Sequence, residues 1–138
     1  MKYEKSCGAV IYTIAHDEVL FLIEKMKSGY YALCKGHVEQ DETEIDTARR
    51  EIEEETNLQV DFIDGFRERI EYCPYRGCRK EVIFFLAKSE SMDVIPQESE
   101  VKDIYWLPYD AAMKRLTHRL SRNVLAEAKK FMGKLETL

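Results

Sequence analysis

The sequence predicts an α/β fold in which a mixed β-sheet is packed between helices. Apolar runs rich in β-branched and aromatic residues precede and follow a central segment of strong helix formers, and a second amphipathic segment ends the chain. The order strands, helix, strands, helix favours helices on the faces of one sheet. With 138 residues, the chain has the length of one domain, which we expect to span residues 1–138.

Strands are predicted where a short apolar run is rich in β-branched and aromatic residues. These runs are residues 6–14, 18–24, 30–34, 58–72, 79–88 and 103–107. Residues 15–17 fit a hairpin turn between the first two runs, and residues 73–78 fit a loop. From residue 111 to about residue 132, the apolar spacing predicts one amphipathic helix or a broken pair of helices.

The central helix is predicted over residues 42–56, which contain no Pro or Gly and are dense in helix formers. Asp41 followed by Glu44 fits a capping box at its start. Asn57 stands where the helix should end, since Asn tolerates the left-handed conformation of that position. One stripe of apolar residues at helical spacing should face the core: Ile45, Ala48 and Ile52.

Composition indicates an ordinary globular protein, with 45% hydrophobic and 34% charged residues. The 26 acidic residues outnumber the 21 basic ones, which argues against an extended nucleic-acid footprint. No apolar run approaches the ~20 residues that span a bilayer. The first six residues also lack the apolar stretch of a signal peptide. We therefore expect a cytoplasmic protein without a membrane partner, either a monomer or a homodimer.

The cysteines are Cys7, Cys34, Cys73 and Cys78. Only Cys73 and Cys78 are close in sequence, with four residues between them and no second Cys or His pair nearby. This spacing gives poor support for a zinc site. In a cytoplasmic chain we expect reduced thiols.

A cluster of carboxylates is the strongest chemical signal in the sequence. Glu51, Glu54 and Glu55 are related as i, i+3 and i+4, so they share one side of the predicted helix. Like charges at these spacings destabilise a bare helix by about 0.2–0.5 kcal/mol per pair. A bound Mg²⁺ reverses that penalty, because Mg²⁺ prefers oxygen ligands and bridges carboxylates to phosphates. The alternative is a solvated acidic face, and the fixed upstream spacing described next argues against it.

Residues 36–58 resemble the Nudix box, G-x5-E-x7-R-E-U-x-E-E-x-G-U, in which U is a bulky aliphatic residue. The matching positions are Gly36, Glu42, Arg50, Glu51, Ile52, Glu54, Glu55 and Leu58. Asn57 departs from the pattern by standing in place of Gly, and Asp41 stands where many members carry Gly. The resemblance implies the Nudix α/β/α sandwich and Mg²⁺-dependent hydrolysis of a nucleoside diphosphate linked to another group, with Mn²⁺ as an alternative cation.

The same resemblance implies roles for the box residues. The expected metal ligands are the carboxylates and one backbone carbonyl: Glu51, Glu54, Glu55 and Gly36. Arg50 would orient the glutamates through charge-assisted hydrogen bonds, and Glu42 would stabilise the loop–helix–loop without a catalytic role.

A general base must activate the water that attacks phosphorus. The candidates are Glu51 and a loop glutamate beyond the box. Glu100 is the first choice of loop residue, because it stands just before the predicted strand at 103–107, and Glu98 is the alternative.

Outside the box, the chain is similar to asymmetrical diadenosine tetraphosphate hydrolases over about residues 6–110. This similarity implies cleavage of diadenosine tetraphosphate to ATP and AMP. Lys35 and His37 would contact phosphates at the mouth of the site, with help from Lys80. Tyr72 or Tyr75 would stack on an adenine ring.

One residue near the box departs from those hydrolases, because Cys34 replaces the usual proline before Lys-Gly. That departure bears on substrate choice. Alternative substrates on the same scaffold are the 5′ pyrophosphate of RNA, a nucleoside triphosphate or a nucleotide sugar. A different class is a nucleotide-sensing Nudix domain that binds without cleaving. Retention of every box glutamate favours catalysis.

Overall fold

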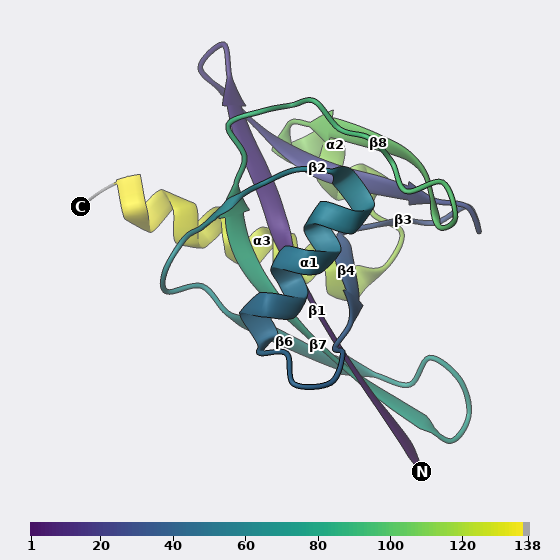
Figure 1. Cartoon of the computed structure of the whole chain (residues 1–138). Helices are drawn as coiled ribbons and strands as arrows, with labels where there is room; N and C mark the ends of the chain where they lie inside the picture. Colours follow the sequence, from purple (N-terminus) through teal and green to yellow (C-terminus); the bar gives the residue numbers. More distant parts are fainter. Residues whose placement is uncertain (137–138) are drawn as a thin grey trace.

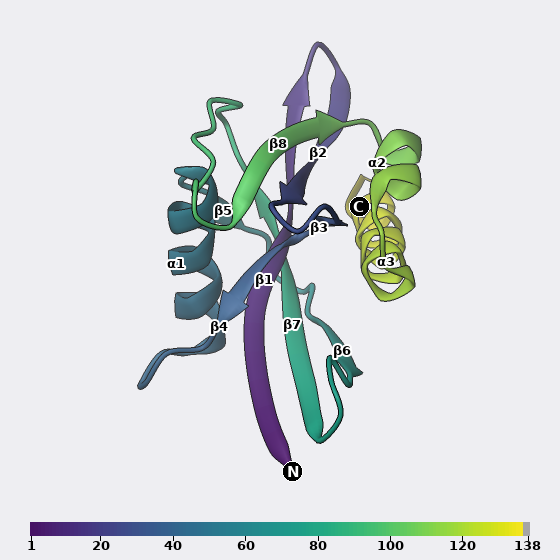
Figure 2. The same cartoon turned by 90° about the vertical axis from the view of Figure 1, so that its right-hand side faces the viewer.

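In the computed structural model, which describes residues 1–136, a mixed sheet of eight strands lies between two helical layers (Figures 1 and 2). The predicted fold class is therefore confirmed. The elements in chain order are β1 (Lys2–Ala15), β2 (Glu18–Met26), β3 (Tyr31–Ala32), β4 (Cys34–His37), α1 (Glu44–Thr56), β5 (Asp61–Phe62), β6 (Glu68–Tyr72), β7 (Cys78–Lys88), β8 (Val101–Leu107), α2 (Tyr109–Arg115) and α3 (Arg119–Glu136).

One long segment differs from the sequence prediction, and a second one decides between two alternatives that the prediction left open. The strand predicted over 58–72 is wrong in its middle, because a turn at Gly65, with φ of 100°, separates β5 from β6. The helical segment predicted from residue 111 is a broken pair, α2 and α3. No helix in the described part of the chain is long and apolar enough to span a membrane. All four cysteines are free.

The sheet is split along one edge of its central strand, β1. Along its whole other edge, β1 pairs in parallel with β7, from Lys2 opposite Cys78 to Tyr12 opposite Lys88. On the split edge, β1 pairs antiparallel with β4 as far as Ala9 and with β2 from Tyr12 onward. Consequently β2 and β4 diverge from β1 at the same level of the sheet, beside α1.

Each face of the sheet is covered by its own helical layer (Figure 2). Successive strand residues point to opposite faces, so Val10 packs in the core beneath α2 and α3, while Ile11 packs in the core beneath α1. Ala48 and Ile52 of α1 are fully buried. Two of the three residues of the predicted apolar stripe are therefore in the core, while Ile45 is only partly buried. Glu55 of the same helix is also buried, so the carboxylates lie next to this stripe.

Both ends of α1 have defined caps. The predicted Asp41–Glu44 capping box is wrong by two residues, since the cap is Thr43, whose hydroxyl accepts a hydrogen bond from the Asp46 backbone N–H at 3.1 Å. Asp41 instead has a φ of 67° and belongs to the preceding turn. At the other end, Asn57 has a φ of 65° and closes the helix as predicted.

Candidate active site

The end of β4 lies directly against helix α1. A Cβ atom added to Gly36 would be 1.9 Å from the carboxyl carbon of Glu51. Only glycine leaves room for this approach. The contact places the Glu51 carboxylate directly against the backbone of β4.

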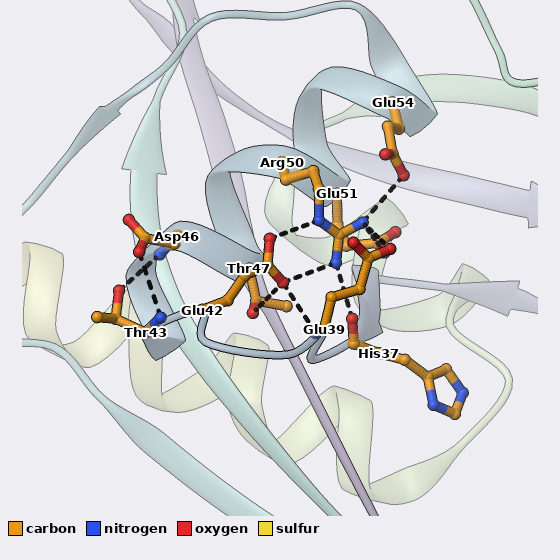
Figure 3. A network of polar contacts seen from close by, with 9 residues as sticks. All are labelled: His37, Glu39, Glu42, Thr43, Asp46, Thr47, Arg50, Glu51 and Glu54. Carbon is orange, nitrogen blue, oxygen red and sulfur yellow. Dashed lines mark hydrogen bonds and ion pairs between the residues drawn. The ribbon is translucent and has the colours of Figure 1, made fainter.

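Arg50 organises the outer carboxylates (Figure 3). Its Nε donates to Glu42 at 2.7 Å, and Nη2 donates to the His37 carbonyl at 2.8 Å. Its Nη1 donates to Glu51 at 2.8 Å and to Glu54 at 3.2 Å. The guanidinium therefore holds two candidate metal ligands in place.

Glu42 serves this network as a support. Its carboxylate accepts hydrogen bonds from the Glu39 backbone N–H and from the Thr47 hydroxyl, both at 2.9 Å. The Arg50 guanidinium, followed by these two donors, lowers the pKa of Glu42 to about 2. With both oxygens engaged, Glu42 has the contacts of a structural residue.

The third candidate ligand on α1 lies in a different environment. Glu55 is 1% exposed and lies beside two other buried side chains, Glu24 of β2 and Cys34 of β4. The ligand atoms of these three residues are all within 4.8 Å of one another. Burial raises the pKa of Glu24 and of Glu55, because the charged form of each is removed from water and faces the other.

Glu24 was missed by the sequence prediction. A signal was present, since this charged residue interrupts the apolar run of β2 and is nevertheless 1% exposed. A charged side chain is almost never fully buried unless it has a partner. Its partners come from β4 and α1, and their proximity is not visible in the sequence.

A cavity of about 340 Å³ opens beside the carboxylates. Three lysines are among its lining residues: Ser6, Met26, Lys27, Ser28, Tyr30, Lys35, Gly36, His37, Lys80 and Glu100. The structure thus brings together Lys35, His37, Lys80 and Glu100, which the sequence suggested separately. Burial, aided by neighbouring Lys35, lowers the pKa of Lys80 to about 8.

Arg50 and the predicted metal-binding glutamates of α1 are not part of this lining, and neither are three residues predicted outside positions 36–58. Glu98 lies in the loop before β8 and is exposed. Tyr72 lies opposite Lys80 on the neighbouring strand and packs against the core. Tyr75 is exposed on the β6–β7 turn, where its hydroxyl donates to Glu4 at 3.0 Å. Tyr30 is the aromatic residue of the lining, and the sequence offered no signal that separated it from an ordinary strand residue.

A second hollow, of about 400 Å³, lies at the other side of α1 near Arg49 and Asp61. None of the predicted site residues lines it. The chemistry suggested by the sequence is therefore associated with the smaller cavity.

The layered fold, the glycine against a glutamate helix and the arginine clamp together define a Nudix domain. The chain matches the family described as NUDIX domain over residues 2–128, and it belongs to that family. Among its relatives, it is similar to the asymmetrical bis(5'-nucleosyl)-tetraphosphatase of Sus scrofa, with 29% identity over 93% of this chain and 95% of that protein. These similarities make the chain a pyrophosphohydrolase of the Nudix type.

Solved structures agree with this placement. The C. elegans Ap4A hydrolase in a binary complex superimposes with a TM-score of 0.87 and 26% identity, covering 95% of this chain and 98% of that one.

A further relative, found by sequence, is the NAD-capped RNA hydrolase NudC of Haemophilus influenzae. It is 27% identical over 83% of this chain, which spans only 44% of that protein.

Proposed function

We propose that this protein hydrolyses diadenosine tetraphosphate to ATP and AMP in an Mg²⁺-dependent reaction. The observation that carries the proposal is the cationic cavity at Lys35 and Lys80, which opens beside Gly36 and the Glu51 carboxylate. Its charge suits a polyphosphate chain on a protein whose formal net charge is −5. Similarity to asymmetrical tetraphosphatases along nearly their whole length supports the same substrate class.

The residues present fit a hard divalent cation. The ligands would be the carboxylates of Glu51, Glu54 and Glu55 together with the Gly36 carbonyl. Two features favour a cation here: the close approach of Gly36 to Glu51, and a Glu55 oxygen that has no hydrogen-bond partner among residues 1–136. Bound Mg²⁺, or Mn²⁺ in its place, supplies a more acidic water and offsets charge on the attacked phosphate.

The remaining steps belong to side chains. Lys35 and Lys80 bind the phosphate chain, and Arg50 keeps Glu51 and Glu54 in position. Glu100, on the wall of the same cavity, accepts a proton from the attacking water as its oxygen bonds to phosphorus and the P–O bond to the ATP leaving group breaks. Glu98 is less suited to this role because it does not line the cavity.

The test is product analysis with diadenosine tetraphosphate, in Mg²⁺ and again with a chelator. We expect ATP and AMP in equal amounts, only with the cation. Glu54→Gln should keep the fold and lower turnover by roughly 100-fold or more, since it removes charge from the metal ligands. Glu53→Gln is the matched control, because Glu53 is an exposed neighbour on the same helix that makes no contact with Arg50.

Full turnover in Glu54→Gln would contradict the metal assignment. Cleavage of a capped or 5′-triphosphorylated RNA, a nucleoside triphosphate or a nucleotide sugar, with diadenosine tetraphosphate untouched, would keep the chemistry and reject the substrate. Tight binding of the tetraphosphate without cleavage would instead indicate a nucleotide-sensing domain.

A further inference from the structure

A cluster of three buried side chains lies where β2 and β4 diverge from β1. Glu24 comes from β2, Cys34 from β4 and Glu55 from α1, and each is 1% exposed. Cys34 itself packs in the apolar core beneath α1, beside Ile52. Two carboxyl groups and a thiol are unusual contents for such a core, since Asp and Glu are rarely buried without a partner.

One oxygen of each carboxyl group in this cluster has no hydrogen-bond partner in the described part of the chain. Glu24 Oε2 and Glu55 Oε2 are both buried, and neither has a hydrogen-bond partner within residues 1–136. No Lys, Arg or His side chain of the described residues forms an ion pair with either carboxyl group. Most buried polar atoms in folded proteins do have a partner. Two buried oxygens without partners, on side chains that lie beside a buried thiol, therefore indicate a missing ligand.

We propose that Glu24, Cys34 and Glu55 form an inner site for one transition-metal dication of the zinc class. The donor set is two carboxylate oxygens and one sulfur, all within 4.8 Å of one another. Three protein donors with a fourth position for water is a common arrangement for zinc. On binding, the Cys34 thiol and the carboxyl groups would release their protons to solvent, and the thiolate and two carboxylates would be the ligands of the ion.

Cys34 is the residue that distinguishes this site from the proposed Mg²⁺ site. Sulfur is a soft donor that suits Zn²⁺ or Co²⁺, whereas Mg²⁺ takes oxygen ligands. The two sites share Glu55, but Glu24 and Cys34 belong to the inner site alone. The inner ion would link the C-terminal end of α1 to β2 and β4.

The test uses the metal-free protein, without substrate, titrated with Co²⁺ as a spectroscopic substitute for Zn²⁺. We expect a sulfur-to-cobalt charge-transfer band in the near ultraviolet and strong visible bands of a four-coordinate ion. One equivalent of Zn²⁺ should abolish these bands, and a large excess of Mg²⁺ should leave them. Cys34→Ser should remove the charge-transfer band. Glu24→Gln should weaken Zn²⁺ affinity by about 100-fold, since even indirect partners of metal ligands contribute about 10- to 100-fold.

Cys7→Ser is the matched control, because Cys7 is an equally buried thiol on β1 outside the cluster. It should keep the band. Absence of the band in the unaltered protein, or its persistence in Cys34→Ser, overturns the proposal. If Cys34→Ser does not fold, cadmium-113 NMR of the unaltered protein decides. A shift typical of mixed sulfur and oxygen ligands supports the site, and an oxygen-only shift overturns it.

This result is separable from the proposed function. The cobalt spectrum requires no turnover, whereas hydrolysis is measured with Mg²⁺ and a nucleotide. A protein that shows the band and cleaves no nucleotide would contradict the proposed function alone.

Discussion

Two adjacent glutamates of α1 lie in opposite electrostatic environments. The Glu54 side chain is 48% exposed and accepts a hydrogen bond from Arg50. Glu55, the next residue, is 1% exposed and keeps one oxygen without a partner. The outer carboxylates are therefore held in place by hydrogen bonds from Arg50, whereas burial of the inner pair favours bound protons or a bound cation.

This difference divides the candidate site into an outer and an inner part with different roles. The outer part, around Arg50, is rigid because one guanidinium serves four acceptors, including the backbone of His37. The inner part, around Glu24 and Glu55, is buried in the core, and its charge would change if a metal bound there. Substitutions in the two parts should therefore change turnover and the free energy of unfolding to different extents.

Removing the inner charge should have the largest effect on activity. Glu55→Gln is expected to lower turnover of diadenosine tetraphosphate on the order of 100- to 1,000-fold, about 3–4 kcal/mol of transition-state stabilisation. The free energy of unfolding in chelator should change by less than about 1 kcal/mol, because Gln resembles the protonated Glu in size and charge. Initial rates and urea unfolding measure both. A Glu55→Gln protein with ordinary turnover would remove the inner carboxylate from the active site.

Loosening the outer part should cost stability as well as activity. Arg50→Lys keeps the charge but cannot fork between Glu42 and Glu51, so we expect a loss of about 2 kcal/mol in the free energy of unfolding and at least a several-fold fall in turnover. Arg49→Lys is the matched control. Arg49 is exposed, with its guanidinium 5.0 Å from the centre of the Phe62 ring, so that change should cost less than about 1 kcal/mol. Equal losses for the two variants would mean that Arg50 has no special ordering role.

The outer part could be predicted from the sequence because its residues are close together in the chain. Gly36 lies in β4, and Arg50 and Glu51 lie in α1, the next element of the chain. Helical spacing places the glutamates on neighbouring positions without knowledge of the rest of the fold. The capping residue was the exception. Asp41 and Thr43 are both good caps, and only the observed turn at Asp41 decides between them.

The inner part could not be predicted from the sequence, because its residues come together only where the sheet splits between β2 and β4. Residues 24, 34 and 55 have no spacing that a motif would capture, and the zinc argument from sequence considered only the close pair Cys73 and Cys78. Long-range convergence depends on strand pairing, which a single sequence does not specify. The burial of a charged residue in β2 was the one clue.

The inner carboxyl groups should also make stability depend on pH. Burial raises the pKa of Glu24 and of Glu55 above the ordinary value of 4.5, so the folded metal-free protein holds protons that the unfolded chain releases. Stability should therefore be greatest below about pH 4.5 for these groups and fall as the pH rises toward neutrality, by at most about 1.4 kcal/mol per unit for each proton. Cys34, Lys35 and Glu51 also face the pair. Urea unfolding in chelator at pH 5, 6, 7 and 8 measures the slope.

Glu24→Gln should flatten that slope, and added Zn²⁺ should reverse it, since metal binding requires the deprotonated ligands. The contribution of Glu42 to stability depends on pH in the opposite direction. Its pKa is lowered to about 2, so its contribution is present above about pH 4.5 and disappears as the pH falls through 2. A slope in Glu24→Gln as steep as in the unaltered protein would contradict the assignment to the inner pair.

The smallest expected effect concerns phosphate binding at the cavity. Burial and Lys35 lower the pKa of Lys80 to about 8, so the free enzyme loses this charge as the pH rises through 8. The KM for diadenosine tetraphosphate should then rise by a few-fold between pH 7 and 9, with kcat less affected. Lys80→Arg should remove the rise because Arg stays charged, while Lys102→Arg, an exposed change on β8, should leave it. A rise that persists in Lys80→Arg would place the titrating group elsewhere, and Lys35 would be the next residue to replace.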